Sequence, residues 1–238
     1  MPRSHSPRPR TRRPQRPRVS RTLPASFYAR DTLVVARELL GCVLVRRAED
    51  GSLRKGRIVE VEAYVGEEDK ACHARAGRTP RTETLYGPPG LAYVYLTYGM
   101  HHMLNAVTEP EGRPAAVLIR AAEPLAGFDQ MARARGLSSA TGADTHRLLS
   151  GPAKLCQALG LDLSHNRIAL RGPVLSIEPG EPVPDALVAR SARIGCESAA
   201  APWDTMPWRF YEDGSRFVTP GRARAAKTRG GKRSRHRD

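Results

Sequence analysis

The sequence predicts a single α+β domain in which helices surround a curved, mostly antiparallel sheet. Residues 57–65 and 91–98 are typical of strands, because side chains of one kind recur at every second position. Residues 31–40 and 150–160 instead carry the start and stop signals of helices. From residue 168 to 218, proline and glycine divide the chain into short strand-like pieces. Elements of both kinds in one chain favour a layered α+β architecture.

The helices are predicted from their ends. Asp31 can cap the first helix, which Gly41 should end, because aspartate accepts from free backbone N–H groups and glycine adopts the left-handed conformation. Two more helices are expected on similar signals: Glu123-Pro124 toward Gly136, and Ser150 to Gly160.

The strand at 57–65, RIVEVEAYV, contains an unusual pair of carboxylates. Strict alternation puts Ile58, Glu60, Glu62 and Tyr64 on one face. Buried carboxylates need a partner or a chemical use. Taken alone, the pattern fits a solvated face or salt bridges better than a general base at the bottom of a cleft. Three further strands are expected, at residues 42–46, 91–98 and 115–120.

The net charge of +15 is concentrated at the two ends of the chain. Residues 1–22 contain eight arginines and no acid, and residues 219–238 contain eight basic residues and one aspartate. Of the 39 basic and 24 acidic residues, 23 of each remain for residues 23–218, which are therefore neutral. We predict a disordered Arg- and Pro-rich tail (1–22), a globular domain (23–218) and a disordered basic tail (219–238).

The basic tails have two interpretations: they keep the protein soluble, or they are polycationic arms that bind nucleic acid. Composition favours the second without separating DNA, RNA and an anionic surface. The first tail has no apolar stretch for a secretory signal, and no apolar run is long enough to cross a membrane. We expect a cytoplasmic, nucleoid-associated protein if the source is bacterial and a nuclear one if it is eukaryotic.

The four cysteines lie far apart and form no C-x-x-C pair. This spacing predicts neither a disulfide framework nor a zinc site. The adjacent pairs His101-His102 and Cys72-His73 are poorly spaced for metal binding, because neighbouring side chains diverge. We expect reduced thiols and no metal.

Three of the seven tyrosines, Tyr93, Tyr95 and Tyr98, lie within six residues of one another. Tyr93 and Tyr95 share one face of their strand, and Tyr98 stands at its end beside Gly99. Aromatic packing within a sheet is common. Beside carboxylates and basic tails, however, aromatic faces favour stacking on nucleobases. The residues alone therefore favour nucleic-acid binding and leave catalysis open.

An ordered series of motifs resembles the alkyladenine (3-methyladenine) DNA glycosylase family. The resemblance covers essentially all of residues 23–218, and the order of the motifs makes it specific. The motifs are ARELLGCVLVRR (36–47), IVEVEAY (58–64), ED-x-A-x-H-A-R (68–75), TPR (79–81), YVYLTYGMHHMLN (93–105), VLIRAAEPL (117–125), GPAKLCQALG (151–160), RIGC (193–196) and PWRFY (207–211).

The resemblance implies a hydrolytic site. Glu62 matches the glutamate that activates water, and Glu60 is its structural neighbour, which is expected to form a salt bridge with a basic residue. Arg120 and the main-chain carbonyl of Ile194 match groups that help to hold the water. For Arg120 alone, a strand-end salt bridge would be the simpler interpretation.

The resemblance also implies how a damaged base is bound after it is flipped out of the duplex. Tyr64, His73 and Tyr95 match residues that stack on the base, and a cationic purine gains about 1–2 kcal/mol from aromatic faces. Asn105 matches a residue that opposes the exocyclic amine of guanine, although for Asn105 alone a turn-forming side chain would be the simpler interpretation. Tyr98 matches the wedge that fills the vacated stack, flanked by Met100.

The resemblance implies direct hydrolysis without a metal or cofactor, leaving a free base and an abasic site. None of the residues matched to the site is a lysine, so no Schiff base or strand cleavage is expected. The expected partner is double-stranded DNA with damaged purines, no membrane is involved, and the protein is expected to be a monomer. The lesion preference is not determined.

Two other classes of protein compete with this interpretation. In a non-enzymatic nucleic-acid binding module, the tyrosines would stack on bases and Glu62 would be structural. The family's structural likeness to the carboxy-terminal domain of methionyl-tRNA formyltransferase makes RNA binding an alternative at the level of the fold. A ribosome-associated basic protein is disfavoured, because the core carries no net charge.

Overall fold

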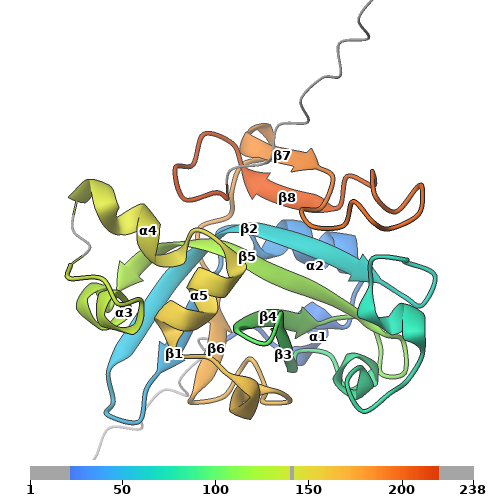
Figure 1. Cartoon of the computed structure of the whole chain (residues 1–238), viewed down its shortest axis with the longest axis horizontal. Coiled ribbons are helices and arrows are strands. Elements are labelled where there is room, and N and C mark those ends of the chain that lie inside the picture. Colours follow the sequence, from blue (N-terminus) through green and yellow to red (C-terminus); the bar gives the residue numbers. More distant parts are fainter. Residues whose placement is uncertain (1–21, 140–141, 220–238) are drawn as a thin grey trace, which may run out of the picture.

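One eight-stranded sheet organises the protein, and every strand pairing in the described residues is antiparallel (Figure 1). The computed structural model describes residues 22–139 and 142–219. Six strands follow the order β3-β4-β5-β2-β1-β6, and β8 joins β7 to β2. The predicted α+β class with an antiparallel sheet is confirmed.

The strands are β1 (Val43–Arg47), β2 (Leu53–Val65), β3 (Ala92–Thr97), β4 (His101–Val107), β5 (Ala115–Ala126), β6 (Leu175–Glu178), β7 (Val188–Ser191) and β8 (Arg209–Glu212). The α-helices are α1 (Ala25–Tyr28), α2 (Thr32–Leu39), α3 (Phe128–Ala134), α4 (His146–Leu149) and α5 (Pro152–Leu159). Short 3-10 helices are η1 (His73–Ala76), η2 (Glu83–Tyr86), η3 (Gly142–Thr145), η4 (Leu163–His165) and η5 (Asp185–Leu187). None of the helices in the described ranges is both long and apolar enough to span a membrane.

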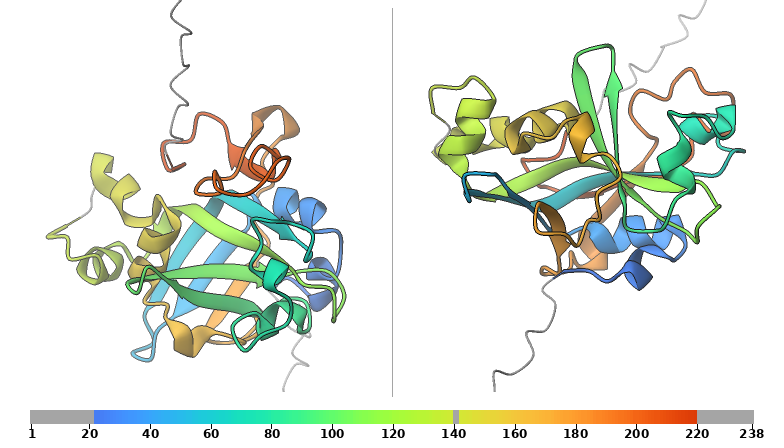
Figure 2. Two further views of the ribbon diagram at one scale, coloured as in Figure 1. Left: turned by 45° about the vertical axis from the view of Figure 1, so that its right-hand side comes forward. Right: turned by 90° about the horizontal axis from the view of Figure 1, so that it is seen from below.

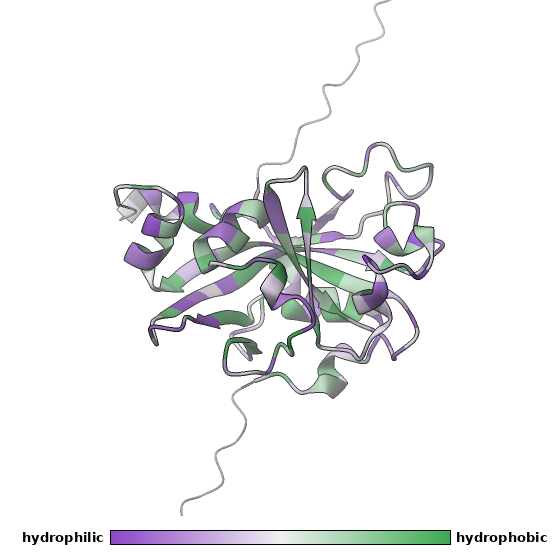
Figure 3. Cartoon of the chain, turned by 60° about the horizontal axis from the view of Figure 1, so that its bottom comes forward, coloured by the Kyte–Doolittle hydropathy of each residue, from purple (hydrophilic) through white to green (hydrophobic). Residues whose placement is uncertain are grey.

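The two longest strands, β2 and β5, pair along most of their length and cross the centre of the molecule (Figure 1). The main hydrophobic core lies between these strands and helices α2, α4 and α5. In Figure 3 the hydrophobic colour is concentrated in the central strands, and the surrounding helices and loops carry more of the hydrophilic colour. The sheet is therefore stabilised by apolar burial, which leaves its polar positions available for a site.

A β-bulge in β2 overturns the predicted alternation. The register against β5 shifts between Ile58 and Glu60 and again between Glu60 and Val61. Ile58 therefore packs in the main core, whereas Val59 belongs to a separate cluster beside Ala121. The prediction that Ile58 shares a face with Glu62 was wrong, because one extra residue reverses the side of everything before it.

Two helix starts were also predicted wrongly. Strand β5 continues through Glu123 and Pro124 as far as Ala126, with Glu123 paired opposite Arg57 and bonded to its guanidinium at 3.1 Å. The next helix begins only after Gly127. Ser150 forms an isolated bridge to Ala121, and α5 instead begins after Gly151 with proline at its first position.

The first helix agrees with its prediction. The side chain of Asp31 accepts hydrogen bonds from the N–H groups of Leu33 and Val34 at 2.9 and 3.0 Å. Gly41 follows the helix with a φ of 91°, in the region that favours glycine. A residue with a Cβ would not fit at this position, because the added atom would collide with the backbone of Glu181.

The hairpin of β3 and β4 projects from the body of the molecule (Figure 2, right). At its turn Tyr98 and Gly99 both have positive φ, 50° and 67°, and the N–H of Met100 donates to the carbonyl of Thr97. A tyrosine is rarely found in this conformation. Strain at an exposed turn indicates a constraint other than packing, and Tyr98 is 89% exposed.

The predicted tails, 1–22 and 219–238, lie almost wholly outside the described residues. Only Thr22 and Thr219 of these segments are described. Thr219 is bonded into the domain, because its N–H donates to Glu60 at 2.6 Å. The predicted boundary between the globular domain and the C-terminal tail, between Val218 and Thr219, therefore separates Thr219 from its hydrogen-bond partner Glu60.

Candidate active site

A cleft of about 270 Å³ opens beside the β3–β4 hairpin. Its walls come from every second residue of three neighbouring strands, since alternate side chains point to the same face. Small-molecule pockets begin near 300 Å³, so this cleft suits one small planar group. The strand residues are Tyr93, Tyr95 and Thr97 of β3, Met103 and Asn105 of β4, and Ala116, Leu118 and Arg120 of β5.

Loops complete the cleft. Ala71, Cys72 and His73 approach from one side and Ile194, Gly195 and Cys196 from the other. Seven predicted site residues therefore line one cleft, although they come from six segments of the chain: Tyr64, His73, Tyr95, Tyr98, Asn105, Arg120 and Ile194.

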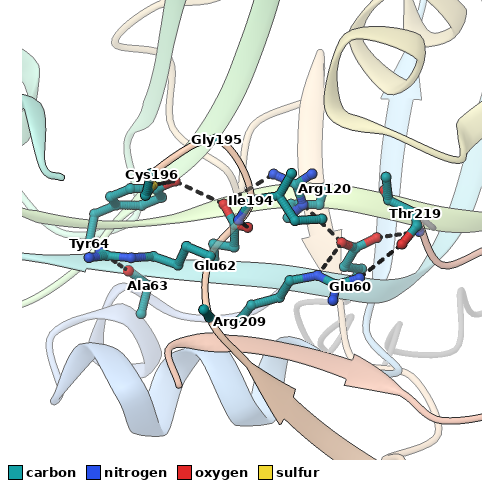
Figure 4. Close-up of polar contacts among 12 residues, drawn as sticks. Glu60, Glu62, Ala63, Tyr64, Arg120, Ile194, Gly195, Cys196, Arg209 and Thr219 are labelled. Carbon is teal, nitrogen blue, oxygen red and sulfur yellow. Dashed lines mark hydrogen bonds and ion pairs between the residues drawn. The ribbon is translucent and has the colours of Figure 1, made fainter. Parts of the chain in front are cut away.

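Glu62 lies under the floor of the cleft and is fully buried. Its carboxylate accepts three hydrogen bonds, from the hydroxyl of Tyr64 at 2.8 Å, a guanidinium nitrogen of Arg120 at 3.1 Å and the N–H of Ile194 at 2.7 Å (Figure 4). All three donors line the cleft. Because a carboxylate has about four acceptor positions, this arrangement leaves one unused.

Burial, followed by the nearby Glu62 carboxylate, raises the pKa of the Tyr64 hydroxyl well above its usual value. Tyr64 therefore remains protonated at neutral pH and keeps its hydrogen bond to Glu62. One face of the Tyr64 ring packs against the guanidinium of Arg193, whose central carbon lies 4.7 Å from the ring centroid. A base that stacks on Tyr64 must use the ring face away from Arg193.

Glu60 is equally buried but does not line the cleft. One of its oxygens accepts from Arg120 at 2.9 Å and from Arg209 at 2.7 Å, so the predicted salt bridge is present. Arg120 thus bridges the two carboxylates (Figure 4). Burial acts to lower the pKa of Arg120, but Glu62 and Glu60 outweigh burial and raise it, so the guanidinium stays charged.

His73 forms the aromatic side of the cleft together with the tyrosines of β3. Its ring meets Tyr95 edge-on, with centroids 4.5 Å apart, and its Nδ1 lies 2.9 Å from the hydroxyl of Tyr93. Because His73 and Tyr95 touch, a base can stack against this pair but cannot enter between them. Burial, then Arg81 and Arg75, lower the pKa of His73 to about 4, so its ring is neutral at pH 7.

Asn105 is buried at the end of the cleft, and its side-chain nitrogen donates to the carbonyl of Tyr93 at 3.1 Å. This bond fixes the orientation of the amide. Tyr98 reaches the rim of the cleft from the exposed hairpin turn. Met100, 69% exposed, instead lines a groove between the hairpin and α5, so it is not part of the cleft.

The loop that carries Ile194 is held by an ion pair that the sequence analysis did not identify. Arg193 and Asp69 are both buried, and Nη1 of Arg193 lies 2.5 Å from Oδ2 of Asp69. Arg193 also donates to the carbonyls of Ala63 and Trp203, and Asp69 accepts from the N–H of Val65. Both residues lie within matched motifs, but nothing local in the sequence shows that positions 124 residues apart form a pair.

Comparison with known proteins identifies this arrangement. The model of the methylpurine-DNA glycosylase family matches residues 26–216. The chain belongs to this family. The match includes every predicted site residue and the ion pair of Arg193 with Asp69.

Three bacterial relatives, each named "Putative 3-methyladenine DNA glycosylase", are similar over most of the chain. The protein of Myxococcus xanthus is 52% identical over 84% of this chain and 94% of its own length. The protein of Carboxydothermus hydrogenoformans is 48% identical over 83% of this chain and 98% of its own length. The protein of Chlorobaculum parvum is 43% identical over 89% of this chain and 97% of its own length. This chain therefore spans nearly the whole of these family members.

The four cysteines of this methylpurine-DNA glycosylase family member are free thiols in the structure, and all four are buried. Burial raises the pKa of the Cys72 thiol to about 12, and burial followed by Glu62 raises that of Cys196. Both thiols border the cleft but remain protonated, so they are poor nucleophiles. Among the described residues, no cluster of His, Cys, Asp or Glu has the arrangement of a metal site.

The lowered pKa of His73 predicts how stability depends on pH. The unfolded chain binds a proton on His73 below about pH 6.5, whereas the folded chain does so only below about pH 4. The free energy of unfolding should therefore fall as the pH is lowered from 6.5 to 4. Urea unfolding of the wild type and of His73→Gln should show this contribution in the wild type alone. An imidazole that titrates near 6.5 by NMR would contradict the assignment.

Proposed function

We propose that this protein removes damaged purines from double-stranded DNA by hydrolysing the N-glycosidic bond with a water activated by Glu62. Its family membership supports the coarser statement that it is a DNA glycosylase of base-excision repair. The finer mechanism rests chiefly on one observation: a buried carboxylate with one unused acceptor position lies directly beneath an aromatic cleft.

In the proposed reaction the damaged nucleotide leaves the duplex and its base enters the cleft. Tyr64 stacks on one face of the base, and His73 and Tyr95 pack on the other. The neutral His73 suits a cationic alkylated purine, because a protonated imidazole would repel it. Asn105 opposes the exocyclic amine of normal guanine and so excludes it by a clash.

In the chemical step, the water oxygen bonds to C1′ of the sugar while the bond from C1′ to the base nitrogen breaks. The electron pair of that bond leaves with the base, and the water proton passes to Glu62. Arg120 and the main chain of Ile194 keep the carboxylate and the water aligned. The products are the free base and an abasic site.

We further propose that the enzyme is monofunctional and acts as a monomer without a cofactor. Strand cleavage through a Schiff base needs an amine nucleophile. No lysine occurs among the described residues that line the cleft, which supports hydrolysis alone. Incubation with lesion DNA should leave abasic sites that break only on heating with alkali.

Replacing the proposed base gives the first test. Glu62→Gln should still bind lesion DNA but release base at least about 100-fold more slowly, because it cannot take the water proton. Single-turnover release from duplexes that carry one defined lesion measures the rate. Glu60→Gln is the matched comparison, since it makes the same change two residues away but keeps an acceptor oxygen for both arginines. Equal small losses in both variants would exclude the role of Glu62, and no release by the wild type would favour a non-enzymatic binding module.

Tyr98 is tested through base pairing. Tyr98→Ser should slow excision from fully paired duplexes, because the vacated stack is left unfilled. The defect should shrink when the lesion lies opposite a gap, where little stacking opposes flipping. Tyr98 contributes little to packing, being 89% exposed, so stability should be unchanged. The same defect on both substrates would count against a wedge.

The charged ends give an independent test. A variant without residues 1–21 and 222–238 loses every basic residue of the two tails but keeps Thr219. Its affinity for undamaged DNA should depend less on salt, since each lost phosphate contact removes about 0.9 from the slope of log affinity against log salt. Excision at saturating enzyme should stay within a few-fold of wild type. An unchanged slope would show that the tails do not bind DNA.

A further inference from the structure

The segment 217–219 is part of the carboxylate network, although a strongly basic stretch of sequence follows it. The Thr219 N–H donates to Glu60 at 2.6 Å, and the Thr219 carbonyl accepts from Arg209 at 2.9 Å (Figure 4). Phe217, with Val218 against it, packs on Val59 and Ala121. We call residues 217–219 the C-terminal clamp.

One of the two carboxylate oxygens of Glu60 accepts its hydrogen bond from this clamp. Oε1 accepts from Arg120 and Arg209, whereas Oε2 accepts, among the described residues, from the Thr219 amide. A fully buried carboxylate oxygen without a donor is costly. Without the Thr219 amide, the carboxylate would gain by rotating Oε2 toward its arginines.

Such a rotation would be transmitted to Glu62. Arg120 contacts Glu60 through Nε and Glu62 through Nη1, so one planar guanidinium joins the two carboxylates. Its Nη1 lies 3.1 Å from Glu62, and a shift of about 0.5 Å would take this bond beyond good geometry. The position of the clamp therefore influences the group that orients the catalytic carboxylate.

We propose that the main chain of Thr219 is a positioning element for hydrolysis: through Glu60 it holds Arg120 against Glu62. This inference rests on the proposed function. It also connects the basic tail to the reaction through Thr219, in addition to the proposed contact of the tail with DNA. Arg222, the first basic residue of that tail, follows Thr219 by three positions, so the DNA-binding tail is attached directly to the catalytic network.

Thr219→Pro and Thr219→Ala form the test pair in the full chain. Proline removes the N–H that binds Glu60, whereas alanine keeps it. The Thr219 hydroxyl has no hydrogen-bond partner among the described residues, so its loss in Thr219→Ala should have little effect. Thr219→Pro should lower single-turnover base release at saturating enzyme about tenfold, the effect of one lost hydrogen bond. The enzyme concentration at half-saturation should stay within twofold, because the cleft is untouched.

Glu60→Gln breaks the same contact from the other side and serves if Thr219→Pro does not fold. Its amide can keep the oxygen toward both arginines but offers no acceptor to Thr219. Hydrogen exchange at the Thr219 amide should then become faster, together with a comparable fall in the rate. Where both single variants fold, the double variant should be no slower than either, since both remove one bond.

The outcomes separate the two proposals. If the wild type releases no base, the proposed function fails. If the wild type is active and Thr219→Pro matches Thr219→Ala, the clamp plays no part in the reaction. If Thr219→Pro raises only the enzyme concentration at half-saturation and leaves the rate at saturating enzyme unchanged, Thr219 acts in DNA binding and the inference is overturned. Unchanged hydrogen exchange at the Thr219 amide in Glu60→Gln would also overturn it.

Discussion

The contact of Arg120 with Glu60 and Glu62 is the interaction on which the rest of the site depends. Two carboxylates two residues apart on one strand would repel each other in a buried environment. A guanidinium can meet both, because its donors point in several directions from one plane. Arg209 adds a second positive charge, so two acids and two bases are buried without net charge. Removing either arginine would leave a buried carboxylate undercompensated.

Such a network contributes little to stability, because the cost of desolvating charged groups is close to the gain from pairing them. An apolar cluster would fill the same space at less cost. The network does fix the geometry of Glu62, which receives donors from β2, from β5 and from the loop after β7. A carboxylate held from three directions needs little reorganisation when it reacts.

Because successive side chains point to opposite faces of the sheet, residues of the core alternate with residues of the cleft along a strand. On β5, Val117 and Ile119 enter the main core, while Leu118 and Arg120 face the cleft. The bulge in β2 makes the same division possible there: Ile58 and Val61 are both in the core, although they are three positions apart and strict alternation would put them on opposite faces. The loops on either side of the cleft are joined by Arg193 and Asp69, which lie behind Tyr64. The residues proposed to bind the base are thus supported by buried charge rather than by the sheet alone.

The sequence by itself determined the fold class, the family and seven of the residues that line the cleft, because the strand period and the ordered motifs are local patterns. It also located the charge, since counting needs no structure. Only the tertiary structure decided that Ile58 turns into the core, that β5 runs on past Pro124 and that Thr219 belongs to the domain. A bulge depends on the partner strand. The partners of Glu60 stand 149 and 159 residues away in the sequence, and such pairs form only when the folded sheet brings their segments together.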